Sequence, residues 1–367
     1  MVASMIRYAE ERDPSRLANL DFRIVLMGAA SDAASQEPFC HYPDKLLTLE
    51  ELGVAERVDC HWRRADGISC ASLDALCSHL LVRKRALVPV SCGIFAQVVD
   101  RYNKEGMAEA LVLRDNPNPG GDTDYFAVAD QVQKRAQRVL VPSDAAAKAA
   151  SLLGTEVMVV GHGPTDEWLR VVAGVDGEQV MRRLKLDGQR TLLVYAGAYG
   201  DFYEPSLRRF LDLMAHESVQ ALKPQVLILP HPRFQGRIEA PICSCYQEKI
   251  RIMGPFFQDS PQYMTMREAL AIADLVVTAD ATSTIVSQAS ALGKLVLHVN
   301  PTISKVSRSL YELGMLERVS SPHELAEAIR QSSLAAEGAP KKKTALEILG
   351  IPEGGAKLLW EAFLEER

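Results

Sequence analysis

Residues 273–299 read ADLVVTADATSTIVSQASALGKLVLHV and decide the class of fold. Residues 274–278 and 294–299 are short runs rich in Val and Leu, which is typical of strands buried on both faces of a sheet. Between them, apolar residues recur at helical spacing: Ile285, Ala289 and Leu292. A strand, a helix and a second strand in this order predict a parallel sheet.

The same alternation of strand and helix continues outward in both directions along the chain. In the second half the predicted strands are residues 191–196, 225–229, 250–253, 274–278, 294–299 and 316–319. In the first half they are residues 23–27, 57–60, 86–91, 109–113, 138–141 and 156–160. Each set is large enough for one sheet, so we predict an α/β protein with two Rossmann-like, doubly wound parallel-sheet domains.

The length of 367 residues also favours two domains over one. Glycine and proline interrupt the strand pattern in GHGPTDEW, residues 161–168, and mark a crossover between the two sets of strands. We therefore expect an amino-terminal domain over residues 1–165 and a carboxyl-terminal domain over residues 166–340. Residues 341–367 are expected to form a linker and an amphipathic helix that packs back on the first domain.

Two helix starts carry recognisable capping residues. Ser143 is placed to cap a helix that ends before Gly154. Ser321 precedes Pro322 and stands three residues before Glu324, which is the pattern of a capping box with proline at the first helical position.

Composition narrows the class of function. A formal charge of -6 argues against a general nucleic-acid binder, so a small-molecule partner is expected. The amino terminus lacks the apolar region of a signal peptide, and the 7 cysteines are scattered, which predicts a cytoplasmic protein with reduced thiols and no metal site. Short basic runs at residues 83–85 and 341–343 are candidates for weak contact with an anionic membrane surface.

Two loops that follow predicted strands of the second half have phosphate-binding chemistry. Gly197, Tyr199 and Gly200 lie in a loop that leads into a helix expected to start near residue 205, where backbone can pass close to a ligand. His231 and Arg233 follow the next strand, and both side chains can donate hydrogen bonds to a phosphate.

A third loop of the second half follows residues 274–278. Thr282, Ser283 and Thr284 are placed at the start of a helix, where hydroxyl and backbone N–H donors favour an anion, and Thr282 or Ser283 can also cap that helix. Asp280 precedes them, and Gln288 is expected on the side of the helix nearer the ligand. These residues complete the set that we predict to bind a nucleotide.

Two carboxylates in the first half are candidates for a catalytic base. Asp115 follows the predicted strand 109–113, and Asp32 follows the predicted strand 23–27. A carboxylate at such a strand end can accept a proton or bind a substrate hydroxyl.

Taken together, these loops resemble the GT-B glycosyltransferases. The likeness is carried by residues 136–143, 190–197 and 273–299. The resemblance implies two Rossmann-like domains facing a cleft, the first binding the acceptor and the second binding the nucleotide-sugar donor. No metal or cofactor is implied besides a UDP-, GDP-, CMP- or CDP-type donor.

The resemblance is partial at positions that carry charge in the family. Retaining members have an E-x7-E motif, and Asp280 and Gln288 stand at its two ends here, with Gly293 at the family's spacing. Ala198 stands where those members usually have Arg. The pair of His231-Pro232 and residues 282–284 is instead similar to bacterial sialyltransferases and to polyol-phosphate polymerases, which use cytidine-nucleotide donors.

The expected function is therefore glycosyl transfer from a nucleotide sugar to a glycan, lipid or protein acceptor, with Asp115 or Asp32 as the base if the reaction inverts. Two alternatives remain open. One is a nucleotide-sugar 2-epimerase, which shares the fold and a Gly-Lys element at residues 293–294. The other is a catalytically inactive GT-B-like protein that binds nucleotide or assists assembly.

Overall fold

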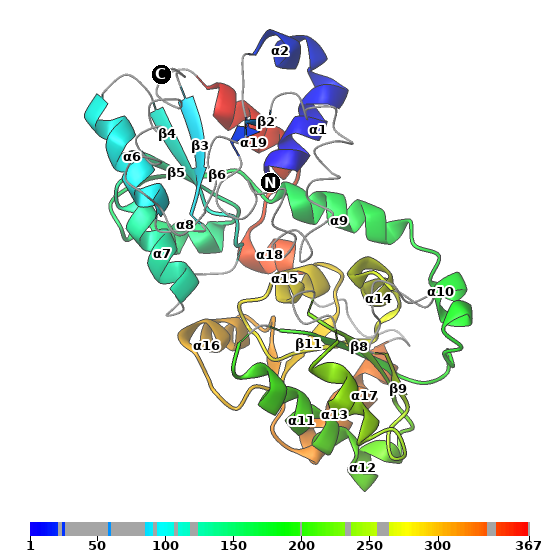
Figure 1. The fold of residues 1–367 in the computed structure, drawn as a ribbon. Helices are drawn as coiled ribbons and strands as arrows, with labels where there is room; N and C mark the ends of the chain where they lie inside the picture. The colour runs from blue at the N-terminus through cyan, green and yellow to red at the C-terminus, as the bar shows by residue number, and fades with distance from the viewer. Residues whose placement is uncertain are drawn as a thin grey trace. The chain divides into compact units, whose positions relative to one another are not determined.

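A computed structural model describes residues 1–20, 24–25, 58–59, 85–90, 94–105, 109–117, 124–198, 200–231, 236–254, 264–335 and 343–365. Contacts between Cα atoms divide the chain into two compact units. The amino-terminal unit comprises Met1–Asp166 together with Ile351–Arg367, and the carboxyl-terminal unit comprises Glu167–Gly350. Figure 1 shows the elements of both units.

Four parallel strands form the main sheet described in the amino-terminal unit, in the order β3, β4, β5, β6. They are β3 (Arg85–Pro89), β4 (Glu109–Leu113), β5 (Arg138–Val141) and β6 (Glu156–Val159). A separate parallel pair is formed by β1 (Ile24–Val25) and β2 (Val58–Asp59). One face of the main sheet packs on α6 (Ile94–Glu105), α7 (Asp124–Gln133) and α8 (Asp144–Ser151).

The opposite face of this sheet is covered by the two ends of the chain. Helix α1 (Val2–Arg12) and helix α19 (Gly355–Leu364) bury Ile6 and Leu359 against Leu111 and Leu140. Helix α2 (Pro14–Asn19) follows α1. The blue α1 and red α19 lie side by side in Figure 1.

Glycines bring two backbone segments of the amino-terminal unit into direct contact. A Cβ on Gly355 would lie 2.4 Å from the amide nitrogen of His162, and one on Gly161 would lie 2.7 Å from the Cα of Gly355. The Gly355 N–H donates to Asp166 Oδ2 at 2.7 Å. Larger residues at either glycine would therefore force the segments apart.

All six strands of the sheet in the carboxyl-terminal unit are parallel, in the order β12, β11, β10, β7, β8, β9. They are β7 (Leu192–Ala196), β8 (Gln225–Leu229), β9 (Ile252–Met253), β10 (Leu275–Thr278), β11 (Leu295–His298) and β12 (Glu317–Arg318). In the central register, Val194 pairs with Leu227 on one side and with Val276 on the other.

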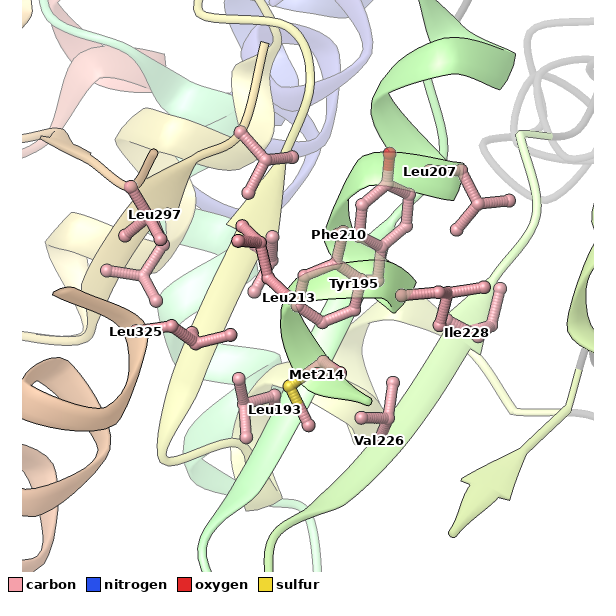
Figure 2. Packing of buried hydrophobic residues seen from close by; sticks show 14 of the residues in the cluster. Leu193, Tyr195, Leu207, Phe210, Leu213, Met214, Val226, Ile228, Leu297 and Leu325 are labelled. Carbon is pink, nitrogen blue, oxygen red and sulfur yellow. The ribbon is translucent and has the colours of Figure 1, made fainter. Parts of the chain in front are cut away.

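Helices cover both faces of this sheet. One face packs on α11 (Tyr203–Met214), α12 (Glu217–Gln220), α13 (Glu239–Ser244) and α17 (Pro322–Ala335). Figure 2 shows the core on this side, where Tyr195 and Leu193 of β7 meet Phe210 and Met214 of α11. On the other side of the sheet Figure 1 shows α14 (Met266–Ile272) and α15 (Thr284–Ala291). The remaining helices are α9 (Gly163–Ala173), α10 (Gly177–Arg183), α16 (Lys305–Glu312) and α18 (Ala345–Leu349).

The structure confirms the predicted α/β class with parallel sheets, and each predicted strand coincides with an observed one. Both predicted caps are present: Ser143 Oγ accepts from the Ala146 N–H at 3.0 Å, and Glu324 bonds back to the Ser321 N–H at 3.0 Å. Helix α11 starts at Tyr203, two residues before the predicted start. Pro205 therefore lies within the first turn of the helix, where a proline displaces no intrahelical hydrogen bond. In the described residues, we find no helix with the length and hydropathy needed to span a membrane.

Candidate functional site

The order of strands in the carboxyl-terminal unit reverses between β7 and β10. From β7 the chain proceeds outward to β8 and β9, then returns to β10 on the other side of β7 and proceeds outward to β11 and β12. Connections therefore leave β7 and β10 toward opposite faces of the sheet, as α11 and α15 show (Figure 1). In open α/β sheets, ligands bind at the carboxyl ends of the two strands where the order reverses.

The loops after β7 and β8 touch each other at this edge. The Gly197 N–H donates to the Leu229 carbonyl at 2.8 Å, which extends the pairing of β7 with β8 by one residue. A Cβ on Gly197 would lie 2.2 Å from the backbone nitrogen of His231 and 2.7 Å from the carbonyl carbon of Pro230. Only glycine fits between these backbones, so the structure brings two of the predicted ligand loops together.

The rest of the first loop turns away into α11. Gly200 has a φ of 133°, a backbone conformation that residues with a Cβ atom rarely adopt. Its carbonyl accepts the Tyr203 N–H at 3.0 Å. The Ala198 side chain is buried in the apolar core rather than exposed at the sheet edge. An arginine at this position would place its guanidinium among apolar side chains, at a cost in desolvation.

The loop after β10 is held by its own side chains. Asp280 Oδ1 accepts the Thr282 N–H at 2.8 Å and the Thr282 hydroxyl at 2.6 Å. Ser283 is the N-cap of α15, with its Oγ accepting the Ile285 N–H at 3.4 Å. Asp280 thus shapes the turn from which α15 starts. This structural role differs from the ligand contact predicted for Asp280.

Two further predicted contacts lie on α15. Thr284 is exposed at the first residue of the helix, and Gln288 is half-buried one turn later on the same side. The predicted buried face of this helix is correct at Ile285 and Ala289, whereas Leu292 is half-buried because the helix ends at Ala291.

His298, a buried histidine that the sequence analysis did not predict as a site residue, holds the backbone at the carboxyl end of β10. His298 Nε2 donates to the Ala279 carbonyl at 3.2 Å, and Asn300 Nδ2 donates to the same oxygen at 3.1 Å. The Tyr311 hydroxyl donates to His298 Nδ1 at 2.5 Å, and burial lowers the pKa of His298. The neutral imidazole therefore sets the direction of the backbone just before Asp280. Its position at the carboxyl end of a strand is the signal that could have identified it.

The Gly293-Lys294 element lies at the opposite edge of the sheet. Gly293, with a φ of 71°, lies two residues after the end of α15, and Lys294 precedes β11, so both lie at the amino ends of the strands. Burial lowers the pKa of Lys294, while the nearby charge of Asp274 raises it. This lysine is remote from the edge where the predicted ligand loops gather.

In the amino-terminal unit, Asp115 is exposed just beyond β4. His162 Nε2 donates to the Asp115 carbonyl at 3.0 Å, and the Thr165 hydroxyl donates to His162 Nδ1 at 2.6 Å. Burial, together with the positive amino terminus, lowers the pKa of His162 to about 4. The backbone of Asp115 is thus held by a neutral histidine that the sequence did not single out.

Three predicted site residues lie outside the described residues: Asp32, Tyr199 and Arg233. The first two residues of each basic run, at positions 83–84 and 341–342, also lie outside them. Among the residues that the structure does describe, no three His, Cys, Asp or Glu side chains gather as metal ligands would.

Comparison of the structure with solved protein structures identifies the type of fold. No protein-family model and no curated protein matches the sequence. The structure is similar to UDP-GlcNAc 2-epimerase from Neisseria meningitidis bound to UDP-GlcNAc, with a TM-score of 0.66 and 11% identity over 94% of this chain and 100% of that chain. It is also similar to UDP-GlcNAc 2-epimerase from Methanocaldococcus jannaschii, with a TM-score of 0.64 and 12% identity over 98% of this chain and 94% of that one.

A third similar structure is a glycosyltransferase from Rickettsia africae, with a TM-score of 0.51 and 13% identity over 94% of this chain and 95% of that chain. At such low identity these likenesses establish the fold. The protein has a GT-B-type fold with a parallel, Rossmann-like sheet in each unit.

Proposed function

We propose that the protein is an enzyme that binds a nucleotide sugar at the carboxyl ends of β7 and β10. The observation that carries this proposal is the reversal of strand order between these two strands, with Gly197 after β7, His231 after β8 and the hydroxyl residues 282–284 after β10. Several GT-B-type structures similar to this one contain UDP or UDP-GlcNAc, which supports the same class of ligand here.

The residues at this edge divide naturally between the parts of a nucleotide. The backbone around Gly197, together with the side chains of His231 and Arg233, would bind the diphosphate. The hydroxyls of Thr282 and Thr284 add donors at the start of α15, and the Gln288 amide is suited to a ribose hydroxyl. Helix and side-chain donors of this kind can stabilise a leaving nucleotide without a metal ion.

We propose that the reaction is epimerisation at C2 of the sugar, the alternative that the structural likenesses favour. Both 2-epimerases described above align with nearly the whole chain and have higher TM-scores than the glycosyltransferase. No carbonyl adjoins C2 of such a sugar, so a base can remove the C2 proton only as the bond from C1 to the nucleotide oxygen breaks and a C1=C2 double bond forms. The nucleotide then adds back to C1 while a proton returns to the opposite face of C2. Asp115 is the carboxylate that we propose as the base.

Glycosyl transfer is the second candidate, because the Rickettsia africae glycosyltransferase has a similar fold and the sequence resembles that class. The two reactions differ in what they require. An epimerase changes the nucleotide sugar alone, whereas a transferase needs an acceptor.

The experiment that separates these reactions is incubation with UDP-GlcNAc in D₂O, without acceptor, followed by proton NMR of the sugar. Epimerisation would yield the C2 epimer and replace the C2 hydrogen by deuterium. An unchanged spectrum from an enzyme that binds UDP-GlcNAc would contradict the epimerase proposal. Activity that appears only after an acceptor is added would support transfer, and binding without any turnover would support an inactive protein.

Two variants test the roles of the residues in this reaction. Asp115→Asn should abolish exchange at C2 while leaving nucleotide binding unchanged. Asp100→Asn, on α6 of the same unit, is the matched control and should keep both. Exchange at the wild-type rate in Asp115→Asn would exclude this residue as the base.

The nucleotide itself is identified by thermal shift. UDP, GDP, CDP, CMP and dTDP are compared, because a ligand that binds the native state raises the unfolding temperature. His231→Ala and Gln288→Ala should reduce the shift, whereas Gln331→Ala, an exposed position on α17 of the same unit, should not. If none of the nucleotides stabilises the wild-type protein, the proposed site is wrong.

A further inference from the structure

A polar cluster lies inside the carboxyl-terminal unit, on the α11 side of the sheet. Its members are fully buried: Tyr195, Tyr203, Ser206 and Glu239. Tyr195 belongs to β7, and its ring stacks on those of Tyr203 and Phe210, with centroids 6.3 and 5.1 Å apart. Figure 2 shows Tyr195 beside Phe210 in the otherwise apolar core.

One hydrogen bond in this cluster joins the two segments that follow the touching loops. The Tyr203 hydroxyl donates to Glu239 Oε1 at 2.5 Å. Tyr203 is the first residue of α11, directly after the loop of Gly197 and Gly200. Glu239 is the first residue of α13, the helix that follows the His231 loop. The backbones therefore approach each other at Gly197 and His231, and the helices α11 and α13 that follow are joined by the Tyr203–Glu239 bond.

Stability alone does not explain this cluster, because it contains buried polar atoms without hydrogen-bond partners among the described residues. Within the described part of the chain, Tyr195 Oη, Ser206 Oγ and Glu239 Oε2 are buried without a hydrogen-bond partner. Burying such atoms unpaired is costly, and apolar residues of similar size would pack at least as well. Burial and the charge of Glu239 raise the pKa of Tyr203, so its hydroxyl keeps the proton that it donates.

We propose that Tyr203 and Glu239 are a positioning pair, which holds the backbone at Gly197 against that at His231, where the diphosphate of a nucleotide would bind. This inference rests on the proposed nucleotide site. Neither side chain reaches a ligand, because both are fully buried. Without the bond, the loops would have to be ordered at the moment of binding, and affinity would fall by the cost of that ordering.

A double substitution separates positioning from stability. Tyr203→Phe or Glu239→Met alone leaves a buried polar partner unpaired and should lower the urea midpoint. The double variant Tyr203→Phe/Glu239→Met replaces both partners by apolar groups, so the urea midpoint should recover. UDP affinity, measured by calorimetry, should nevertheless stay weaker than wild type by about tenfold in the double variant.

Tyr246 offers a matched control in the same unit, because the half-buried tyrosine donates its hydroxyl to the Asp212 carboxylate at 2.6 Å in a hydrogen bond that is exposed to solvent. Tyr246→Phe should bind UDP as the wild type does. A double variant with wild-type UDP affinity would overturn the positioning role and leave a structural pair. Failure of the wild type to bind UDP would instead overturn the proposed site, and with it this inference.

Discussion

The carboxyl edges of the two sheets differ in how they can meet a ligand. In the carboxyl-terminal unit the strand order reverses between β7 and β10, whereas the four described strands β3 to β6 of the amino-terminal unit follow one another without reversal. At the first edge, backbone bonds directly to backbone, from the Gly197 N–H to the Leu229 carbonyl. At both edges a histidine side chain fixes one carbonyl group: His298 that of Ala279, and His162 that of Asp115.

This difference indicates two ways of preparing a site. At the reversal, backbone N–H groups and the hydroxyl residues at the start of α15 follow neighbouring strands, a combination that suits a large anionic ligand. At the carboxyl end of β4, in the amino-terminal unit, the Asp115 side chain is exposed while its backbone carbonyl is held by His162. This arrangement suits a single reacting group. The substitutions below test each edge by removing the contact that defines it.

The largest effect on stability and on UDP affinity is expected from Gly197→Ala. The new Cβ would lie 2.2 Å from the His231 nitrogen, so the two backbones must separate. We expect a loss of about 3 kcal/mol in the free energy of unfolding and a loss of UDP affinity of at least about tenfold. Urea unfolding and calorimetry measure the two effects.

Gly188→Ala is the control for this substitution. Gly188 is exposed in the same unit, and a Cβ there would meet nothing within 4 Å. It should leave both quantities near their wild-type values. If Gly197→Ala behaved in the same way, the contact between the two loops would not be what shapes this edge.

The second effect concerns the pH dependence of the amino-terminal edge. His162 has a pKa of about 4 in the folded state, below the value of about 6.5 expected when unfolded. The unfolded chain therefore takes up a proton first, and stability falls as the pH drops from about 6.5 to about 4. His162 should contribute up to about 3 kcal/mol to this loss.

His162→Gln isolates that contribution, because the Gln amide can still donate to the Asp115 carbonyl but does not titrate. The difference in unfolding free energy between wild type and variant should shrink or change sign as the pH falls. Equal pH dependence of the two proteins, measured by urea unfolding at several pH values, would show that His162 is not held neutral.

The strands were predictable because each is a short run of apolar and β-branched residues, and the buried registers of β4, β5 and β8 coincide with those runs. The predicted doubly wound class implies a reversal of strand order. Which two strands flank the reversal was not predictable, since pairing β10 with β7 joins segments that are far apart in sequence.

The same reason explains the site residues that the sequence missed. His298 appears in the sequence as one more residue of a buried strand, and Glu239 appears as an ordinary charged residue at the start of a short helix. Their roles depend on partners elsewhere in the chain, Ala279 and Tyr203. Asp280 and Ser283 were predictable as loop and cap residues because their partners lie within three residues.

The smallest effect is expected at Asp280, where the carboxylate shapes its own loop. Asp280→Ala removes the acceptor for the Thr282 N–H and hydroxyl and should cost about 1 kcal/mol. Asp280→Asn keeps an acceptor oxygen and should cost less. A loss of UDP affinity in Asp280→Asn without any loss of stability would show that the charge acts on the ligand instead.

The central claim is that a nucleotide sugar binds where the strand order reverses in the carboxyl-terminal unit. Amide hydrogen exchange with and without saturating UDP, followed by mass spectrometry, tests it most directly. Bound UDP should slow exchange in peptides that contain Gly197, His231 and residues 279–288, with no change in β4 or α6. Protection confined to the amino-terminal unit, or unchanged exchange in all three loops while UDP is bound, would contradict it.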